Sequence, residues 1–247
     1  MQMSEGVSGH PGTLLLTARA HRHWGRGVIE LFGEQDGDVR FSPTTQEKLA
    51  DEATQSIIVA GRGSWSRALV DGAPPTDPGR LADAIAERLR VLGRPAVRVR
   101  AADFLRPASL RFERGREDPD ARYEAWLDEG ALRREVLDPL GPGGSGRVLP
   151  SLWDAAADRA TRAAYVSLPE GGVVVVDGEL LLGRGLPHEV SVHLSMTPAA
   201  LARRTDEAWA LPAYARYDAE VDPLAVADIA ARVDDPRRPA RRLSAIG

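Results

Sequence analysis

The sequence predicts an α/β fold of three layers, with a mainly parallel central sheet and helices on both faces. Two patterns carry this prediction. Residues 67–101 read as strand, loop, amphipathic helix and strand, which is a βαβ unit and indicates parallel strands. Further along, "VVVVDG" places four valines in a row without polar alternation, as is typical of a strand covered on both faces.

The size and composition of the chain limit the classes of function. With 247 residues and 43% hydrophobic content, the chain suits one large domain or one domain plus an appendage. A net charge of -4 predicts no nucleic-acid partner. The chain has no cysteine, no apolar run long enough for a membrane span and no signal-like start, so we expect a cytoplasmic protein without membrane contact.

The composition divides the chain into three parts. We expect residues 1–60 to be an N-terminal extension or small added element, 61–236 to form the α/β domain, and 237–247 to be a charged tail. His21 and His23 lie in the first part without a third ligand at a suitable spacing. They are expected to be a solvated surface pair, and no metal site is predicted.

Apolar periodicity and capping residues predict the helices and strands of the first half of the chain. "SPTTQEKLADEAT" predicts a helix capped by Ser42 or Thr44. "RALVDG" and "PAVRVRAADF" predict strands that flank a helix over residues 78–92. That helix carries an apolar stripe at spacings of four, formed by Leu81, Ile85 and Leu89.

The second half repeats this alternation of helices and strands. "ALRREVLDPL" predicts a helix, followed by the flexible run "GPGGSG". "VVVVDG" and "EVSVHLSM" predict strands, and "TPAALARRTDEAW" predicts a helix capped by Thr197. A helix over residues 223–227 and a strand in "DIAARV" complete the domain.

The loop after the first strand has the setting of a phosphate-binding loop but not its residues. In the pattern G-x-x-x-x-G-K-[ST], backbone N–H groups hold the phosphates, the lysine reaches them and the hydroxyl binds magnesium. Alignment on Gly72 puts Asp77 at the second glycine, Pro78 at the lysine and Gly79 at the hydroxyl. The only lysine of the chain, Lys48, is far upstream.

Two interpretations of this loop remain open. Arg80 offers a cationic substitute for the lysine, although its planar guanidinium differs from a point charge. Alternatively, the loop is a structural turn that caps the next helix with Thr76 or Asp77. A second match to the pattern, "GPGGSGRV" over residues 141–148, follows a helix rather than a strand, and we interpret it as a loop.

Several segments between residues 67 and 236 together resemble the uridine kinase-like branch of P-loop nucleoside kinases, in its actinobacterial form. They are "VDG", "LADAIAERLRVLGRPAVRVRAADFLRP", "RFERGREDPDARYEAWLDEGALRREVLDPLGPGG", "VVVVDGELLL", "AALARR" and "YDAEVDPLAVADIAARVDDP". The resemblance implies a P-loop kinase-like fold. It also implies ATP on the loop, a nucleoside beside it, and transfer of the γ-phosphoryl group to a ribose hydroxyl.

The resemblance also implies candidate site residues. Its catalytic carboxylate position falls on Ala102, and the neighbouring Asp103 is a weak substitute. Asp177 matches an acidic residue beside magnesium. The candidates for phosphate or nucleotide binding are Gly72, Thr76, Asp77, Gly79, Arg80, Arg203 and Arg204. The candidates for substrate binding are Phe104, Tyr123, Trp126, Asp154 and Arg159, with packing as the competing role of the two aromatic rings Tyr123 and Trp126.

The lost lysine, hydroxyl and carboxylate favour a pseudokinase that binds a nucleoside- or nucleotide-like small molecule or a partner. One alternative is an unorthodox kinase that phosphorylates a small-molecule hydroxyl, and another is a repurposed biosynthetic enzyme. No cofactor is required by the first hypothesis, whereas ATP and Mg²⁺ belong to the kinase alternative. Assembly into a homo-oligomer is left open.

Overall fold

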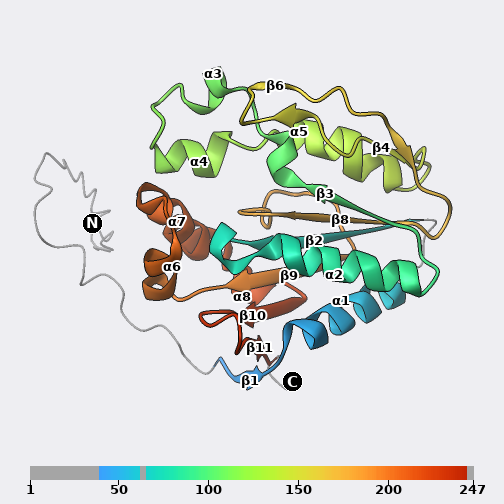
Figure 1. Cartoon of the computed structure of the whole chain (residues 1–247), viewed down its shortest axis with the longest axis horizontal. Coiled ribbons are helices and arrows are strands. Elements are labelled where there is room, and N and C mark those ends of the chain that lie inside the picture. The colour runs from blue at the N-terminus through green and yellow to red at the C-terminus, as the bar shows by residue number, and fades with distance from the viewer. Residues whose placement is uncertain (1–38, 62–64, 244–247) are drawn as a thin grey trace, which may run out of the picture. The chain divides into compact units, whose positions relative to one another are not determined.

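The computed structural model describes residues 39–61 and 65–243, and at its centre is a seven-stranded sheet (Figure 1). Strands β10, β9, β2, β8 and β3 are mutually parallel, whereas β11 and β1 form an antiparallel edge. Taken across the sheet, the strands are β1 Phe41–Pro43, β11 Ala240–Arg242, β10 Ile229–Arg232, β9 Val190–Ser195, β2 Ser66–Gly72, β8 Val173–Gly178 and β3 Ala96–Arg100. The predicted α/β fold with a mainly parallel sheet is confirmed.

Helices α1 Gln46–Ala60 and α2 Pro78–Val91 cover one face of this sheet. The stripe predicted for α2 is its buried side, since Leu81, Ile85 and Leu89 are all fully buried. Side chains alternate between the two faces of a strand, so each strand also contributes every second residue to this layer. The valines of β8 therefore serve both layers, which explains the unbroken apolar run.

The opposite face is covered by a helical run and by two later helices, α7 Leu211–Val221 and α8 Pro223–Val226. The run consists of α5 Glu129–Leu132, a π-helical turn at Arg133–Leu137 and a 3-10 turn at Asp138–Leu140. Helix α7 was not expected from the sequence. Its buried residues are Ala213, Tyr214 and Tyr217, which give little apolar periodicity to detect.

The remaining helices and strands are short. The helices are α3 Ala108–Arg111, α4 Pro119–Ala125 and α6 Pro198–Arg204. Two antiparallel ribbons pair β4 Arg147–Val148 with β7 Val166–Ser167, and β5 Trp153–Asp154 with β6 Arg159–Ala160. Thr197 caps α6, as the sequence predicts. In the part of the chain described here, no helix has the length and apolarity needed to cross a membrane.

The first helix differs in its start from the sequence prediction. Its cap is Thr45, whose side chain accepts a hydrogen bond from Lys48 N at 3.2 Å, rather than Ser42 or Thr44. Ser42 lies instead in β1, where it pairs with Arg241 of β11. Strand β1 and helix α1 thus come from the segment expected to be an extension, and β11 comes from the expected tail. All three are packed into the α/β domain.

Candidate functional site at the carboxyl ends of the strands

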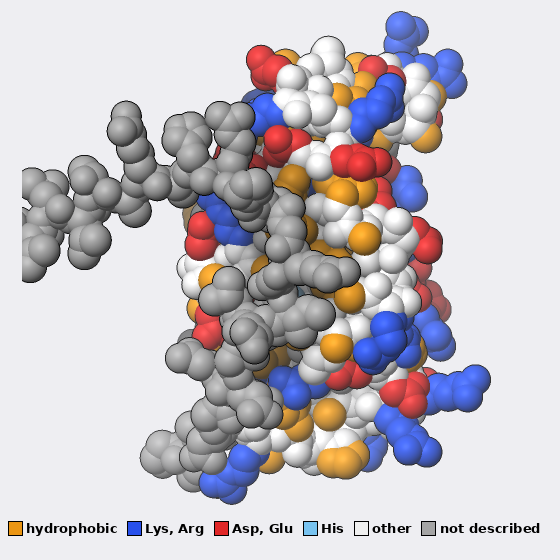
Figure 2. Space-filling view, turned by 90° about the vertical axis from the view of Figure 1, so that its left-hand side faces the viewer, with side chains coloured by type: hydrophobic (Ala, Val, Ile, Leu, Met, Phe, Trp, Pro, Cys, Tyr) orange, Lys and Arg blue, Asp and Glu red, His pale blue; other side chains and the backbone are white. Residues whose placement is uncertain are grey.

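The carboxyl ends of the parallel strands lie together along one side of the sheet, and we call this side the carboxyl edge. It is the usual position of a ligand site in open α/β folds. The register pairs Asp177 of β8 with Val70 of β2 on one side and with Arg100 of β3 on the other. In Figure 1 this edge is on the left, where α2 begins and where α6 and α7 lie. Figure 2 looks onto that side, and acidic and basic side chains are interspersed over its described part.

The loop that follows β2 is a closed turn. Residues 74–76 form one turn of 3-10 helix, in which Thr76 N–H donates to Ala73 O at 2.8 Å and Asp77 N–H donates to Pro74 O at 3.0 Å. The Thr76 hydroxyl also donates to Ala73 O, at 2.7 Å. These internal bonds use N–H groups that a phosphate-binding loop directs at its ligand, and Pro74 and Pro75 have none to offer.

Asp77, rather than Thr76, caps the following helix. Its backbone adopts the left-handed region with φ of 55°, at the place of the second glycine of the phosphate-binding pattern. Its carboxylate accepts a hydrogen bond from Arg80 N at 3.2 Å. Asp and Asn tolerate this backbone conformation better than most residues because their short polar side chains bond locally. Asp77 therefore has a structural role in the helix start.

Gly72 begins the turn in a confined space. A Cβ at this position would lie 2.4 Å from Thr76 Oγ1 and 2.9 Å from Leu194 O. The turn is therefore folded tightly back against the ends of β2 and β9. A glycine is needed here for this close approach.

Asp177, the residue expected beside magnesium, is held by an arginine of the neighbouring strand. Arg98 of β3 donates from Nε to Asp177 Oδ1 at 2.6 Å and from Nη2 to Oδ2 at 2.8 Å. Its third nitrogen, Nη1, donates to Asp83 of α2 at 2.7 Å. The hydrogen bonds with Asp177 raise the pKa of the Arg98 guanidinium, which therefore stays charged.

The candidate base Asp103 also has an arginine partner. It lies in the 3-10 turn Ala101–Phe104 after β3, where Arg100 donates to its two carboxylate oxygens at 2.6 and 3.1 Å. The side chain of Asp103 is 17% exposed, so one path to solvent remains. Phe104, by contrast, is fully buried in the core, so in this structure it packs rather than facing a ligand.

Tyr123 and Trp126 lie among arginine and aromatic side chains. The Tyr123 ring has guanidiniums over it from Arg184, at 5.5 Å from the centroid, and Arg216, at 4.6 Å. Trp126 contacts the Trp209 ring at 5.6 Å between centroids and donates from Nε1 to Arg111 O at 3.1 Å. These contacts give both rings a packing role and favour it over stacking on a nucleobase.

Arg122, a residue that the sequence analysis missed, fills the space between these aromatic rings. Its side chain is 5% exposed, and its guanidinium carbon lies 5.0 Å from the Trp126 centroid and 5.2 Å from that of Trp209. It forms ion pairs with Glu179 at 2.9 Å and Glu207 at 2.7 Å. Burial alone would lower the pKa of Arg122, but the nearby acidic groups outweigh it and raise the pKa. Arg122 thus joins α4 to the segments that follow β8 and α6.

The remaining substrate candidates lie on the β5–β6 ribbon, which packs on the turn that holds Asp103. Asp154 accepts hydrogen bonds from Ala156 N and Ala157 N, both at 3.0 Å, and these bonds lower the pKa of its carboxyl group. Asp154 therefore shapes the ribbon turn. Arg159 is its cross-strand partner and is exposed. The structure brings Asp103 and this ribbon together, because Leu152 N, just before β5, donates to Asp103 O at 3.0 Å.

The expected phosphate-binding arginines, Arg80, Arg203 and Arg204, are all exposed. Arg80 follows the start of α2, whereas Arg203 and Arg204 form the last turn of α6. Within residues 39–61 and 65–243, none of their guanidiniums has a hydrogen-bond or ion-pair partner. Arg203 and Arg204 are therefore available to an anionic ligand, whereas the charge of Arg80 also acts on Glu47.

A buried polar network lies directly before the loop and was not expected from the sequence. Asp71 is fully buried, and its Oδ2 is 2.7 Å from His193 Nδ1 and 2.8 Å from the Tyr217 hydroxyl that donates to it. Its Oδ1 accepts a hydrogen bond from Leu181 N at 2.9 Å. Burial is the largest of the causes that raise the pKa of Tyr217, so its hydroxyl remains a donor. A histidine inside the strand "EVSVHLSM" was the available signal.

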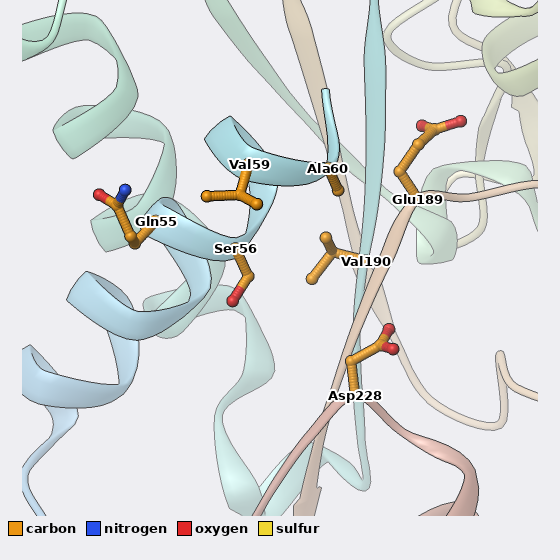
Figure 3. A pocket seen from close by; sticks show the side chains of 7 residues that line it. All are labelled: Gln55, Ser56, Val59, Ala60, Glu189, Val190 and Asp228. Atoms are coloured by element: carbon orange, nitrogen blue, oxygen red, sulfur yellow. The ribbon is translucent and has the colours of Figure 1, made fainter. Parts of the chain in front are cut away.

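Two hollows in the described surface lie away from the carboxyl ends of the strands. One, of about 450 Å³, lies between the end of α1 and the start of β9, at the opposite end of the sheet (Figure 3). Its acidic residues are engaged, because Glu189 pairs with Arg67 and Asp228 accepts hydrogen bonds from Ser191. The other, of about 380 Å³, is bordered by Ser191, His188 and Val221. Neither hollow contains a predicted site residue.

The residues at the strand ends do not fit ATP with magnesium. The N–H groups of Thr76 and Asp77 are bonded inside the turn, Gly79 has no hydroxyl, and the carboxylate of Asp177 is occupied by a guanidinium. Elsewhere in the described ranges, no group of three His, Asp or Glu side chains is placed to hold a metal ion. His21 and His23 lie outside the described residues.

Comparison with solved structures assigns the fold. The chain is similar to a possible uridine kinase from Bacillus stearothermophilus, with a TM-score of 0.61 and 16% identity, over 74% of this chain and 97% of that one. It is also similar to a protein proposed to be a fructose transport system kinase from Silicibacter sp. TM1040, with a TM-score of 0.52 and 26% identity. That match covers 73% of this chain and 89% of the other.

These similarities show that the chain has the fold of uridine kinase-like and other P-loop kinase-like proteins. No protein-family model matches the sequence, and no curated protein matches it either.

Proposed function

We propose that this protein is a pseudokinase, which binds a small nucleoside- or nucleotide-like molecule and transfers no phosphoryl group. The observation that carries the proposal is the pairing of Arg98 with Asp177 beside Gly79. Phosphoryl transfer depends on positioning and on neutralising phosphate charge, for which these kinases use a lysine, a hydroxyl and a magnesium ion. Here the corresponding positions carry Pro78, Gly79 and an internal ion pair.

The part of the fold that corresponds to the nucleoside side of the kinases supports a binding function. The turn with Asp103, the β5–β6 ribbon and α4 form the part of the domain that resembles the nucleoside side of the kinases. Two arginines without partners in the described chain, Arg203 and Arg204, favour a ligand with negative charge. A monophosphate nucleotide combines both features. A cytoplasmic location is proposed on the absence of cysteine.

Calorimetric titration of the full chain tests the proposal. We expect heat of binding with at least one of uridine, cytidine and their monophosphates, both with and without magnesium. We expect no binding of ATP–Mg²⁺ and no phosphorylated product. The variant R203A/R204A should weaken binding of the monophosphates and leave the nucleosides unchanged. Turnover of ATP on any of these acceptors would falsify the pseudokinase function.

An unorthodox kinase is the second candidate, favoured by the remaining solvent access of Asp103 at the end of β3. In that case Asp103 would act as base, and D103N would abolish product formation while the fold is kept. The neighbouring R100Q, which removes the ion-pair partner, should leave some activity. A wild-type protein that gives no product from a panel of nucleosides and sugars eliminates this candidate.

A further inference from the structure

The slot between the first turn of α2 and the end of β8 is filled by the protein itself. In the phosphate-binding pattern, the residue at position 79 carries the hydroxyl that binds magnesium. A Cβ built on Gly79 would lie 3.2 Å from Asp177 Oδ2, so position 79 does face the acidic residue. The same Cβ would lie only 2.3 Å from Arg98 Nη2. The guanidinium therefore lies between the two groups that would share a metal ion.

The absence of a side chain at residue 79 and the presence of Arg98 are physically linked. A serine or threonine at 79 would force the guanidinium, which is the end of a flexible side chain, out of its observed position, because real Cβ atoms essentially never approach other atoms within 3.0 Å. Glycine in the first turn of a helix has an entropic cost relative to alanine. The contact with Arg98 gives a reason for retaining it.

The charges in the slot are already balanced. The Asp177 side chain is 8% exposed and both of its oxygens accept hydrogen bonds from Arg98. Asp83 accepts a further hydrogen bond from the same guanidinium and is 64% exposed. Carboxylate oxygens are the ligands that magnesium and manganese prefer. A divalent ion could reach Asp177 only by displacing a guanidinium bound through all three of its nitrogens.

We propose that Arg98 is a built-in replacement for the divalent cation of a P-loop kinase, and that it prevents metal binding at Asp177. The inference rests on the same ion pair as the proposed function, but it does not depend on which ligand the protein binds. It makes any ligand binding at this edge independent of magnesium. It also implies that removing the guanidinium uncovers a latent cation site made of Asp177 and Asp83.

Titration of the full chain with Mn²⁺, followed by electron paramagnetic resonance, tests this directly. We expect no Mn²⁺ binding in the wild type that depends on Asp177. The wild type and D177N should therefore bind Mn²⁺ equally weakly. R98Q, which is neutral and keeps most of the side-chain length, should bind Mn²⁺ at least about tenfold more tightly than the wild type. The double variant R98Q/D177N should lose that gain, and R98K should behave like the wild type. A folded R98Q variant without added Mn²⁺ affinity overturns the proposal, as does wild-type binding that depends on Asp177.

Thermal unfolding gives a second, metal-free test if R98Q is poorly folded. G79A should lower the melting temperature in the wild type, because its methyl group displaces the guanidinium from Asp177. In the R98A background the same G79A change should be neutral or stabilising, since alanine is the better helix former. Equal effects of G79A in both backgrounds would contradict the claim that a side chain at residue 79 and the Arg98 guanidinium compete for the same space.

Discussion

Asp71 accepts a hydrogen bond from the Tyr217 hydroxyl at 2.8 Å, across 146 residues of sequence. The same hydroxyl accepts one from Leu182 N at 3.0 Å. Asp71 directly precedes the loop that begins at Gly72, and Tyr217 lies on α7. This pair therefore joins the strand that carries the loop to the helix on the opposite face from α2.

Removing the Tyr217 hydroxyl should destabilise the domain. Y217F leaves a buried carboxylate and a buried N–H with one partner fewer, which typically costs about 1–3 kcal/mol. Urea denaturation measures the change in the free energy of unfolding. Y165F is the matched control, because Tyr165 is 48% exposed although its hydroxyl also donates to a carboxylate, that of Glu135. Equal losses for both variants would contradict the burial argument.

Asp77 should be replaceable by asparagine but not by alanine. D77A removes the cap of α2. It also places alanine in the left-handed region, where its side chain cannot form the local hydrogen bonds that help Asp and Asn. We therefore expect a loss of about 1–3 kcal/mol in the free energy of unfolding. D77N keeps both the capping oxygen and the tolerance of this backbone, and should cost less than about 0.5 kcal/mol. Chemical denaturation of the two variants checks this order. Equal losses in D77N and D77A would mean that Asp77 acts through its charge, which both variants remove.

Arg122 should contribute strongly to stability through burial of its charge pair. R122M keeps an apolar side chain between Trp126 and Trp209 but leaves Glu179, which is 25% exposed, without its cation, so we expect a loss of about 1–3 kcal/mol. Guanidinium chloride denaturation followed by tryptophan fluorescence gives the loss. The control is R114Q, because the exposed pair of Arg114 with Glu124 is worth less than about 1 kcal/mol. A small effect of R122M would show that the cluster tolerates the unpaired carboxylate.

Arg216 should make stability depend on pH in the acidic range. Its hydrogen bonds lower the pKa of both Glu124 and Glu220 below the ordinary value of 4.5. The folded state therefore gains stability above about pH 4.5 and loses it as the pH falls through the lowered pKa values. In R216Q the pKa of both carboxyl groups should rise, as measured by NMR titration. The melting temperature of the variant should then fall less between pH 6 and pH 3.5. Unchanged carboxyl pKa values would exclude this role.

Patterns in the sequence alone determined the strand–loop–helix–strand order around Gly72, the buried stripe of α2 and the Thr197 cap. These features depend on neighbouring residues, whose backbone preferences and apolar spacing are visible in sequence. The presence of Pro78 and Gly79 where the phosphate-binding pattern has a lysine and a hydroxyl was equally visible, because the pattern concerns residue types at fixed spacing. Helix α7 escaped detection, since tyrosine and alanine bury its face without a clear period.

Only the tertiary structure decided what the site residues contact. Arg98 and Asp177 are 79 residues apart, and Arg122 and Glu207 are 85 apart. Such pairs depend on strand register and on helix packing, which no local pattern encodes. The sequence places Gly79 where the phosphate-binding pattern has a hydroxyl. The Arg98–Asp177 ion pair beside it was not visible in the sequence, because the parallel sheet brings that guanidinium from the edge strand to the carboxylate.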